Sequence, residues 1–254
     1  MSGERFVGLD LGWTTGATGV AVADETGRLV ASGRVRTDDE IEGWVTCLGG
    51  PIAVAAVDAP LVVPNETGMR DCERLIGHAY GAFGASAHTS NRTRLGGAPR
   101  ASRLALRLGW NPDPASSAGD DTVCIEVYPH PAMIGLFELP YRLDYKKGST
   151  HRRLPGFRAL VGLLEEIPEL DVRSSSRWAD VHRALMDPKP GDLNRWEDEM
   201  DAILCAHLAW LWRHRPGALI VYGSLEDGYI VAPPPPSHRP AKPAPAAFDP
   251  QRES

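Results

Sequence analysis

The stretch Pro51–Val57, PIAVAAV, limits how this chain can fold more than any other segment. A short run without polar side chains, closed here by Asp58, is typical of a strand that is buried on both faces. Such a strand lies inside a sheet, so other segments must cover both sides of it. The sequence therefore predicts an α/β protein built around a central sheet.

The segments before this strand supply the rest of the predicted sheet. Arg5–Asp10 is a second apolar run that ends in an acid, and Thr18–Ala23 and Leu29–Arg36 form an antiparallel hairpin with Gly27 in its turn. A helix is expected over Asp38–Leu48, where apolar residues recur at helical spacing. The first sixty residues thus predict strand, strand, strand, helix, strand, in a mixed sheet with helices on both faces.

Beyond residue 60, the clearest element is the helix Asp192–Arg215, whose apolar residues repeat every three or four positions and define a core-facing stripe. The other predicted elements are Met69–His78, Arg100–Leu108, Thr122–Val127, Leu154–Ile167, Ala179–Leu185, Leu219–Tyr222 and Gly228–Val231. We expect one domain over residues 1–232, in which residues 81–121, rich in Gly, Ser, Pro and Arg, are an insertion or flexible flap. Residues 233–254 are expected to be a disordered, proline-rich tail.

Composition excludes several classes of protein. The four cysteines are isolated and form no CxxC pair, which argues against a zinc knuckle or redox motif and predicts buried thiols in a reducing, cytoplasmic setting. The chain opens directly in a strand-like run, so no signal peptide is expected. The longest apolar helical stretch, Ala202–Trp212, is too short to cross a bilayer, and no membrane partner is expected.

The net charge of −6 does not favour nucleic-acid binding, but the basic residues are clustered. Between His88 and Leu108 the chain has arginines and no acid: Arg92, Arg94, Arg100, Arg103 and Arg107. A second basic stretch contains Lys146, Lys147, Arg152 and Arg153, opposed only by Asp144. These stretches could form a local surface for a polyanion, or they could be ordinary solvated loop charge.

Several acids stand out by position. Asp10 and Asp58 end two predicted strands, Glu126 lies inside an apolar strand, and Asp198 and Asp201 lie one turn apart in the opening part of the last long helix. Taken singly, they could be strand-end caps or acids that match a helix dipole. Taken together, converging carboxylates repel one another unless cations lie between them, and oxygen ligands favour Mg²⁺ or Mn²⁺. Two such ions can support phosphodiester cleavage.

A set of motifs runs through the chain in a fixed order. They are GLDLGW (Gly8–Trp13), VDAPL (Val57–Leu61), DCER (Asp71–Arg74), EVYPHPA (Glu126–Ala132), YKKG (Tyr145–Gly148), EDEMDA (Glu197–Ala202) and EDGYIVAP (Glu226–Pro233). In these motifs the chain resembles the domain-of-unknown-function 429 family, described as predicted nucleases of RNase H-like fold. The resemblance covers nearly the whole chain except the tail.

The resemblance implies metal binding by Asp10, Asp58, Glu126 and Asp201. It also implies that Lys147 and Arg74 lie near the site. One motif departs from the family, which usually shows an EVHPE-like sequence where this chain has Tyr128 and His130. His130 then becomes the candidate to replace the polar group of that motif.

Three interpretations stay open on the sequence. The leading one is a metal-dependent nuclease acting on DNA or RNA, in which Lys147 stabilises charge on the scissile phosphate. Candidates for holding its substrate are Arg74, Arg92, Arg94, Arg100, Lys146 and His130. The second is a non-catalytic nucleic-acid-binding module of the same fold. The third is a phosphotransferase of the actin and sugar-kinase class, because GLDLGWTTGATG resembles its first phosphate loop, although no convincing second loop follows.

Overall fold

The computed structural model describes residues 3–12, 16–116, 121–189 and 191–243. Its strands are β1 (Arg5–Asp10), β2 (Thr18–Ala23), β3 (Leu29–Val35), β4 (Ile52–Asp58), β5 (Val123–Glu126), β6 (Ile220–Ser224) and β7 (Gly228–Ala232). Its α-helices are α1 (Asp38–Thr46), α2 (Asp71–Tyr80), α3 (Arg92–Leu95), α4 (Arg100–Arg107), α5 (Pro129–Leu136), α6 (Thr150–Glu165), α7 (Ser176–Met186) and α8 (Asp192–His214). Two short 3₁₀ turns are η1 (Gly81–Phe83) and η2 (Val172–Ser174).

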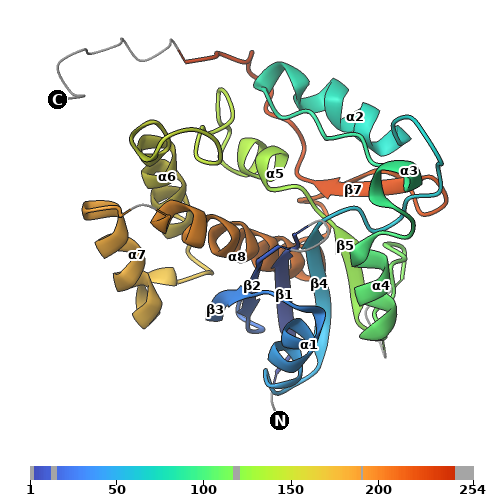
Figure 1. Cartoon of the computed structure of the whole chain (residues 1–254), viewed down its shortest axis with the longest axis horizontal. Coiled ribbons are helices and arrows are strands. Elements are labelled where there is room, and N and C mark those ends of the chain that lie inside the picture. The colour runs from blue at the N-terminus through green and yellow to red at the C-terminus, as the bar shows by residue number, and fades with distance from the viewer. Residues whose placement is uncertain (1–2, 13–15, 117–120, 190, 244–254) are drawn as a thin grey trace.

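The main sheet has the strand order β3-β2-β1-β4-β5 (Figure 1). β1 pairs antiparallel with β2, and β2 with β3, whereas β1, β4 and β5 run parallel. Within β4, residues 53–57 are all buried. The predicted hairpin and the predicted central strand are therefore both confirmed.

Helix α8 covers one face of this sheet at very short range. A Cβ atom at Gly8 of β1 would overlap the backbone of Ala202 and Ala206, and one at Gly19 of β2 would overlap the carbonyl of Asp198. Glycine at these two positions lets the helix backbone approach the strands directly. This close approach carries the middle of α8 to the carboxyl end of β1, where the first candidate acid lies.

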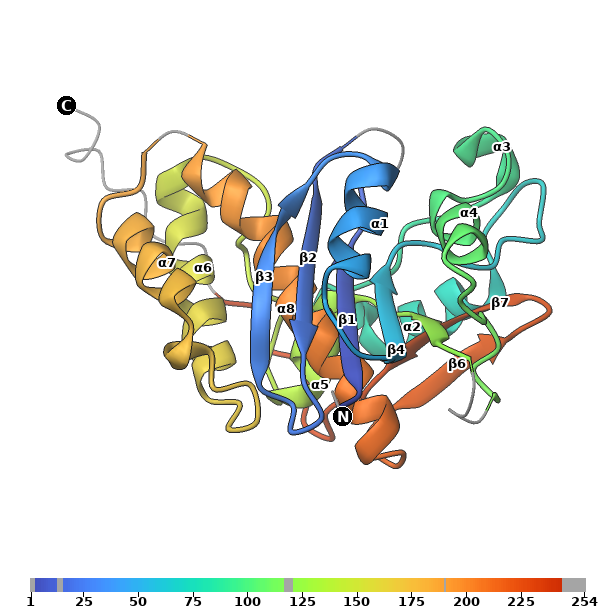
Figure 2. The same cartoon turned by 90° about the horizontal axis from the view of Figure 1, so that it is seen from below.

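Helix α1 lies on the opposite face of the sheet from α8 (Figure 2). Its residues Ile41 and Val45 are buried in the main core. The helix begins at Thr37 with a capping box, in which the Thr37 side chain accepts from the amide of Glu40 and the Glu40 carboxylate accepts in return. The predicted mixed sheet with helices on both faces is confirmed, and the chain has an α/β fold.

A smaller layer adjoins the outer strand β5. The hairpin β6–β7 packs against α2, and Cys72, Ile76, Tyr80 and Ile230 form part of its own apolar cluster. An isolated parallel bridge between Val127 and Val231 joins this layer to the end of β5. The layer therefore brings the segment around α2 beside the carboxyl edge of the main sheet.

Helix α5, which directly follows β5, is not predicted from the sequence. The run Pro129-His130-Pro131 discourages a helix in its interior because proline lacks an amide donor. In the first turn of a helix the backbone amides have no intrahelical acceptor, so a proline that lacks this amide is tolerated there. The motif EVYPHPA thus crosses from the end of a strand into a helix.

The predicted insertion, residues 81–121, contains η1, α3 and α4, and α4 buries Ala101, Leu104 and Ala105 in the main core. Its mobility stays a prediction, and residues 117–120 lie outside the described residues. At the start of the predicted tail, Pro233 accepts a hydrogen bond from Tyr80, and the Ala241 amide donates to the carbonyl of Pro140 at 2.8 Å. The remainder of that tail, residues 244–254, lies outside the described residues.

Three of the cysteines, Cys72, Cys124 and Cys205, are buried free thiols as predicted, whereas Cys47 is exposed at the end of α1. Among the described residues, none of the helices combines the length and the hydropathy that a membrane crossing requires.

Candidate metal centre

Three of the predicted acids meet at the carboxyl edge of the sheet. Asp10 and Asp58 end the neighbouring parallel strands β1 and β4 and are paired in register. Asp201 comes from the third turn of α8, which the glycines of β1 and β2 hold against the sheet. One carboxylate oxygen from each residue lies within 4.8 Å of the other two. We call these residues the acidic triad.

The triad concentrates negative charge in a poorly solvated place. Asp201 is fully buried, and Asp10 and Asp58 are half-buried. Burial, opposed by Lys146 and reinforced by the neighbouring carboxylates, raises the pKa of Asp58 to about 7 and raises that of Asp10 well above its ordinary value. These shifts indicate that Asp10 and Asp58 are not fully compensated by the chain itself.

Within the described residues, Lys146 and Tyr145 contact the triad and partly balance its negative charge. The Nζ atom of Lys146 lies 2.6 Å from Oδ2 of Asp201, and the hydroxyl of Tyr145 donates to Oδ1 at 2.7 Å. Within the described residues, Oδ2 of Asp201 therefore has Lys146 as its ion-pair partner and Oδ1 has Tyr145 as its hydrogen-bond donor. Burial opposes the charge of Lys146, but the triad and Tyr145 outweigh it and raise the lysine pKa well above its ordinary value.

Two further acids of α8 border the triad, and each has its own cation. Asp198, a predicted ligand, is held by Arg34 of β3 at 2.7 Å. Glu197 is held by Arg153 of α6 at 2.7 Å. Burial nevertheless raises the pKa of Glu197 to about 7 and also raises that of Asp198. They line the same cavity as Asp10 and Asp58 but are not part of the triad.

Glu126, the fourth predicted ligand, is not brought into the triad. Arg70 donates to both of its oxygens, at 2.9 Å from Nη1 and 2.6 Å from Nη2, and the amide of Leu61 donates to Oε2 at 2.7 Å. Of the four ligands that the resemblance implied, three therefore converge, and Glu126 does not because a buried guanidinium already pairs with its carboxylate. Arg70, one residue before the motif DCER, has no signal in the sequence that marks it as buried.

Two basic residues are predicted to lie near the acids, and in each case a nearby basic residue occupies that position instead. Lys147 lines the cavity, but the lysine against the carboxylates is Lys146. Arg74 is exposed and pairs with Asp71 on the surface of α2, so it lies outside the site that the resemblance implied for it. The buried arginine of that segment is Arg70.

The predicted arginines of residues 81–121 are separated from the triad. Arg92 pairs with Glu66 at 3.4 Å, and Arg94 is exposed on α3. Arg100 is buried and pairs with Asp38 of α1 at 2.7 Å, so it joins α4 to α1. None of the three lines the cavity that contains Asp10 and Asp58.

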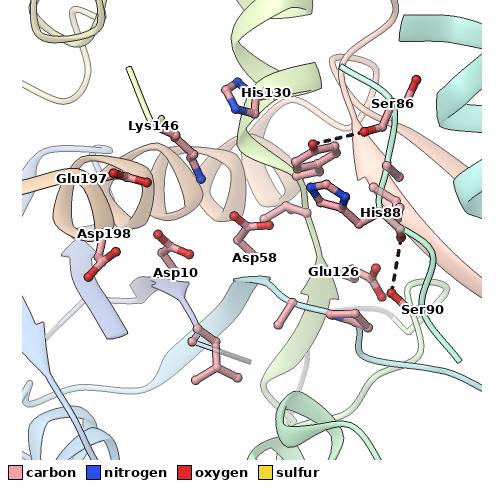
Figure 3. Close-up of a pocket in the computed structure, with 18 of the residues that line it drawn as sticks. Asp10, Asp58, Ser86, His88, Ser90, Glu126, His130, Lys146, Glu197 and Asp198 are labelled. Carbon is pink, nitrogen blue, oxygen red and sulfur yellow. Dashed lines mark hydrogen bonds between the residues drawn. The ribbon is translucent and has the colours of Figure 1, made fainter. Parts of the chain in front are cut away.

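That cavity has a volume of about 360 Å³ and opens above the triad (Figure 3). Asp10, Asp58 and Lys146 point toward the same space, with Glu197 and Asp198 to one side of them and His88 to the other. Predicted residue His130 also lines the cavity and is almost fully buried. The arrangement can hold a cation on oxygen ligands, with a basic wall opposite.

Part of the glycine-rich turn that resembles a phosphate loop, residues 13–15, lies outside the described residues.

Comparison with known proteins identifies a family but no individual relative: no curated protein and no solved structure matches the chain. A family model described as "Protein of unknown function (DUF429)" matches residues 8–226, which include the whole triad, Lys146 and Arg70. The chain therefore belongs to the DUF429 family.

Proposed function

We propose that this protein is a metal-dependent nuclease that hydrolyses phosphodiester bonds in DNA or RNA. The observation that carries the proposal is the acidic triad, in which carboxylates from β1, β4 and α8 converge within 4.8 Å. Structural acids are normally paired or exposed, whereas these three share one ammonium group. A site that retains negative charge in a cavity is a candidate for cation-assisted chemistry on an anionic substrate.

The residues of the triad fit Mg²⁺ or Mn²⁺. Their donors are all carboxylate oxygens, which these ions prefer. When all are ionised, three carboxylates and one ammonium leave two negative charges, which one divalent cation neutralises. Oδ2 of Asp201 is buried against Lys146, so an ion bound there would compete with the lysine for this oxygen. Bound there, the ion supplies Lewis-acid stabilisation of charge on a phosphate undergoing hydrolysis.

The chain's own residues would prepare that reaction. Tyr145 fixes the orientation of Asp201 by donating to Oδ1. Lys146 is held between the triad and the cavity, where its positive charge would also attract a phosphate oxygen. Lys147, on the cavity wall, is exposed enough to meet the substrate directly.

The order of the strands supports an RNase H-like fold. Three antiparallel strands, followed by two parallel ones, put Asp10 and Asp58 side by side at one edge. The buried free thiols are consistent with a reducing compartment, and we propose that the protein acts in the cytoplasm.

The ion pair between Lys146 and Asp201 favours a second candidate, a non-catalytic nucleic-acid-binding module. In that case the lysine takes the place of a metal ion and the triad has only a structural role. The two candidates differ in whether the triad binds a divalent ion.

The test is a cleavage assay on labelled single-stranded and duplex DNA and RNA, with Mg²⁺, Mn²⁺ or a chelator. We expect ion-dependent cleavage that falls about 100-fold or more in Asp10→Asn and Asp201→Asn. Asp187→Asn, at an exposed acid remote from the cavity, is the matched control. Cleavage that survives in Asp10→Asn would contradict the proposal, and calorimetry showing no Mn²⁺ binding would favour the second candidate.

A further inference from the structure

The cavity continues past the triad to a group of basic and aromatic side chains. His88, Tyr128, His130, Arg142 and Lys147 line this part, which we call the basic recess. They come from three places in the chain: the segment before α3, the start of α5, and the segment before α6. The cavity is therefore acidic where Asp10 and Asp58 lie and basic across from them.

His130 is the buried member of the recess. It is 7% exposed, and its Nδ1 atom is buried without a hydrogen-bond partner among the described residues. The ring lies between those of Tyr128 and Tyr145, with centroid distances of 6.0 and 5.3 Å. A buried polar atom without a partner is costly, so a water molecule or a bound group that forms a hydrogen bond with the ring would be favoured here.

The cations of the recess are weakly compensated. Arg142 is exposed, and its nearest acid is Asp144 at 3.8 Å, which is itself exposed. Lys147 has no ion pair within the described part of the chain. Glu73 and Glu126, the buried acids nearby, both pair with Arg70, so these three groups keep only one negative charge between them. The recess thus retains positive charge beside a triad that retains negative charge.

The recess is also held in a defined shape. The Tyr128 hydroxyl donates to the carbonyl of Ser86 at 3.3 Å, and the amide of Ser90 donates to the Glu73 carboxylate at 2.9 Å. These two contacts fix both ends of the segment that contains His88, and Figure 3 shows the first of them, at Ser86. Preorganised donors bind an anion at lower entropic cost than flexible ones.

We propose that the basic recess binds a phosphate group of the substrate, next to the phosphate that is cleaved at the triad. Arg142 can donate two parallel hydrogen bonds to phosphate oxygens, Lys147 adds a point charge, and His130 adds a neutral donor. A volume of about 360 Å³ lies within the range of ligand sites and is enough for one nucleotide unit, which a strand end or an unpaired nucleotide supplies more readily than a paired one. The substrate class is therefore a strand end or an unpaired nucleotide.

This inference rests on the proposed nuclease function, but its test needs no cleavage. Binding is measured in the presence of a chelator with single-stranded oligonucleotides of equal length that carry a 5′-phosphate, a 3′-phosphate or no terminal phosphate. Inorganic phosphate serves as competitor. The variants are Arg142→Gln, Lys147→Gln and their combination, with Lys189→Gln, at an exposed lysine outside the cavity, as control.

We expect the combined variant to weaken oligonucleotide binding about tenfold and to abolish competition by inorganic phosphate, without a change in melting temperature. A loss confined to oligonucleotides with one terminal phosphate assigns the recess to a chain end. An equal loss for all three assigns it to an internal phosphate. The proposal is overturned if the combined variant binds every oligonucleotide as tightly as the parent, even if cleavage fails for other reasons.

Discussion

Two groups of buried acids lie at neighbouring strand ends of this sheet, and they are compensated very differently. At the end of β5, Glu126 shares the guanidinium of Arg70 with Glu73, at 2.6 and 2.9 Å. At the ends of β1 and β4, the acidic triad shares the single ammonium of Lys146. The planar guanidinium of Arg70 contacts both acids of the first group, whereas the compact ammonium of Lys146 contacts one acid of the triad.

This difference distinguishes acids that stabilise the fold from acids that are available to bind a ligand. A buried carboxylate with a matched bidentate partner needs nothing more, and removing either side is expensive. The triad departs from that pattern, since its three carboxylates have one ammonium between them and burial raises the pKa of Asp58 to about 7. Local departures from good pairing are expected at functional sites, where a ligand completes the arrangement. The predictions below test this contrast.

The largest effect is expected at Arg70. Arg70→Ala leaves Glu126 and Glu73 buried without a cation, and should lower the free energy of unfolding by about 3–5 kcal/mol. Arg74→Ala removes an exposed ion pair four residues later and should change it by less than about 1 kcal/mol. Urea denaturation measures both, and similar values for the two variants would refute the structural role of Arg70.

The two groups of acids should respond with opposite sign to loss of one charge. Glu126→Gln removes the bidentate carboxylate of Arg70, which keeps only Glu73 as its partner, and should destabilise the protein by about 2 kcal/mol. Asp10→Asn relieves repulsion within the triad and should stabilise the metal-free protein by about 1 kcal/mol. Unfolding in a chelating buffer tests this, and destabilisation by both variants would show that the triad is already compensated.

The raised pKa of Asp58 predicts how stability depends on pH. Because its pKa is about 7 in the folded protein, the folded state holds a proton that the unfolded state releases near pH 4. Protonated Asp58 therefore contributes to the free energy of unfolding. This contribution is fully present below about pH 4, and on the order of 2 kcal/mol of it is lost as the pH rises to about 7. Unfolding of parent and Asp58→Asn in chelating buffers measures it. A constant difference between the two proteins across this range would contradict the shift.

The smallest effect concerns the competition between Lys146 and a metal ion. Lys146→Gln leaves the triad without its ammonium, so Mn²⁺ affinity should rise by about tenfold, or roughly 1.4 kcal/mol. Lys147→Gln, at the exposed neighbour, should change that affinity much less because water screens its charge. Calorimetry compares them, and weaker Mn²⁺ binding in Lys146→Gln would mean that the lysine positions the ligands instead.

The sequence by itself determined the sheet and all three acids of the triad, although it also included Glu126 and Asp198. Alternation and apolar runs identify strands locally, and acids that end neighbouring parallel strands must share an edge, as Asp10 and Asp58 do. The apolar stripe of α8 likewise identifies the helix that packs on the sheet and carries Asp201. These features depend on patterns within a short window of the chain.

Only the tertiary structure decided which of two similar neighbours enters the site. Tyr145 packs on Phe157, with ring centroids 6.3 Å apart, and its hydroxyl reaches Asp201. That anchor helps to set the path of the segment in which Lys146, and not Lys147, reaches the triad. An acid in an apolar strand needs a partner, but whether that partner is a metal or an arginine 56 residues earlier depends on long-range packing. Short-range patterns do not contain that information, because irregular segments have no fixed periodicity of side-chain direction.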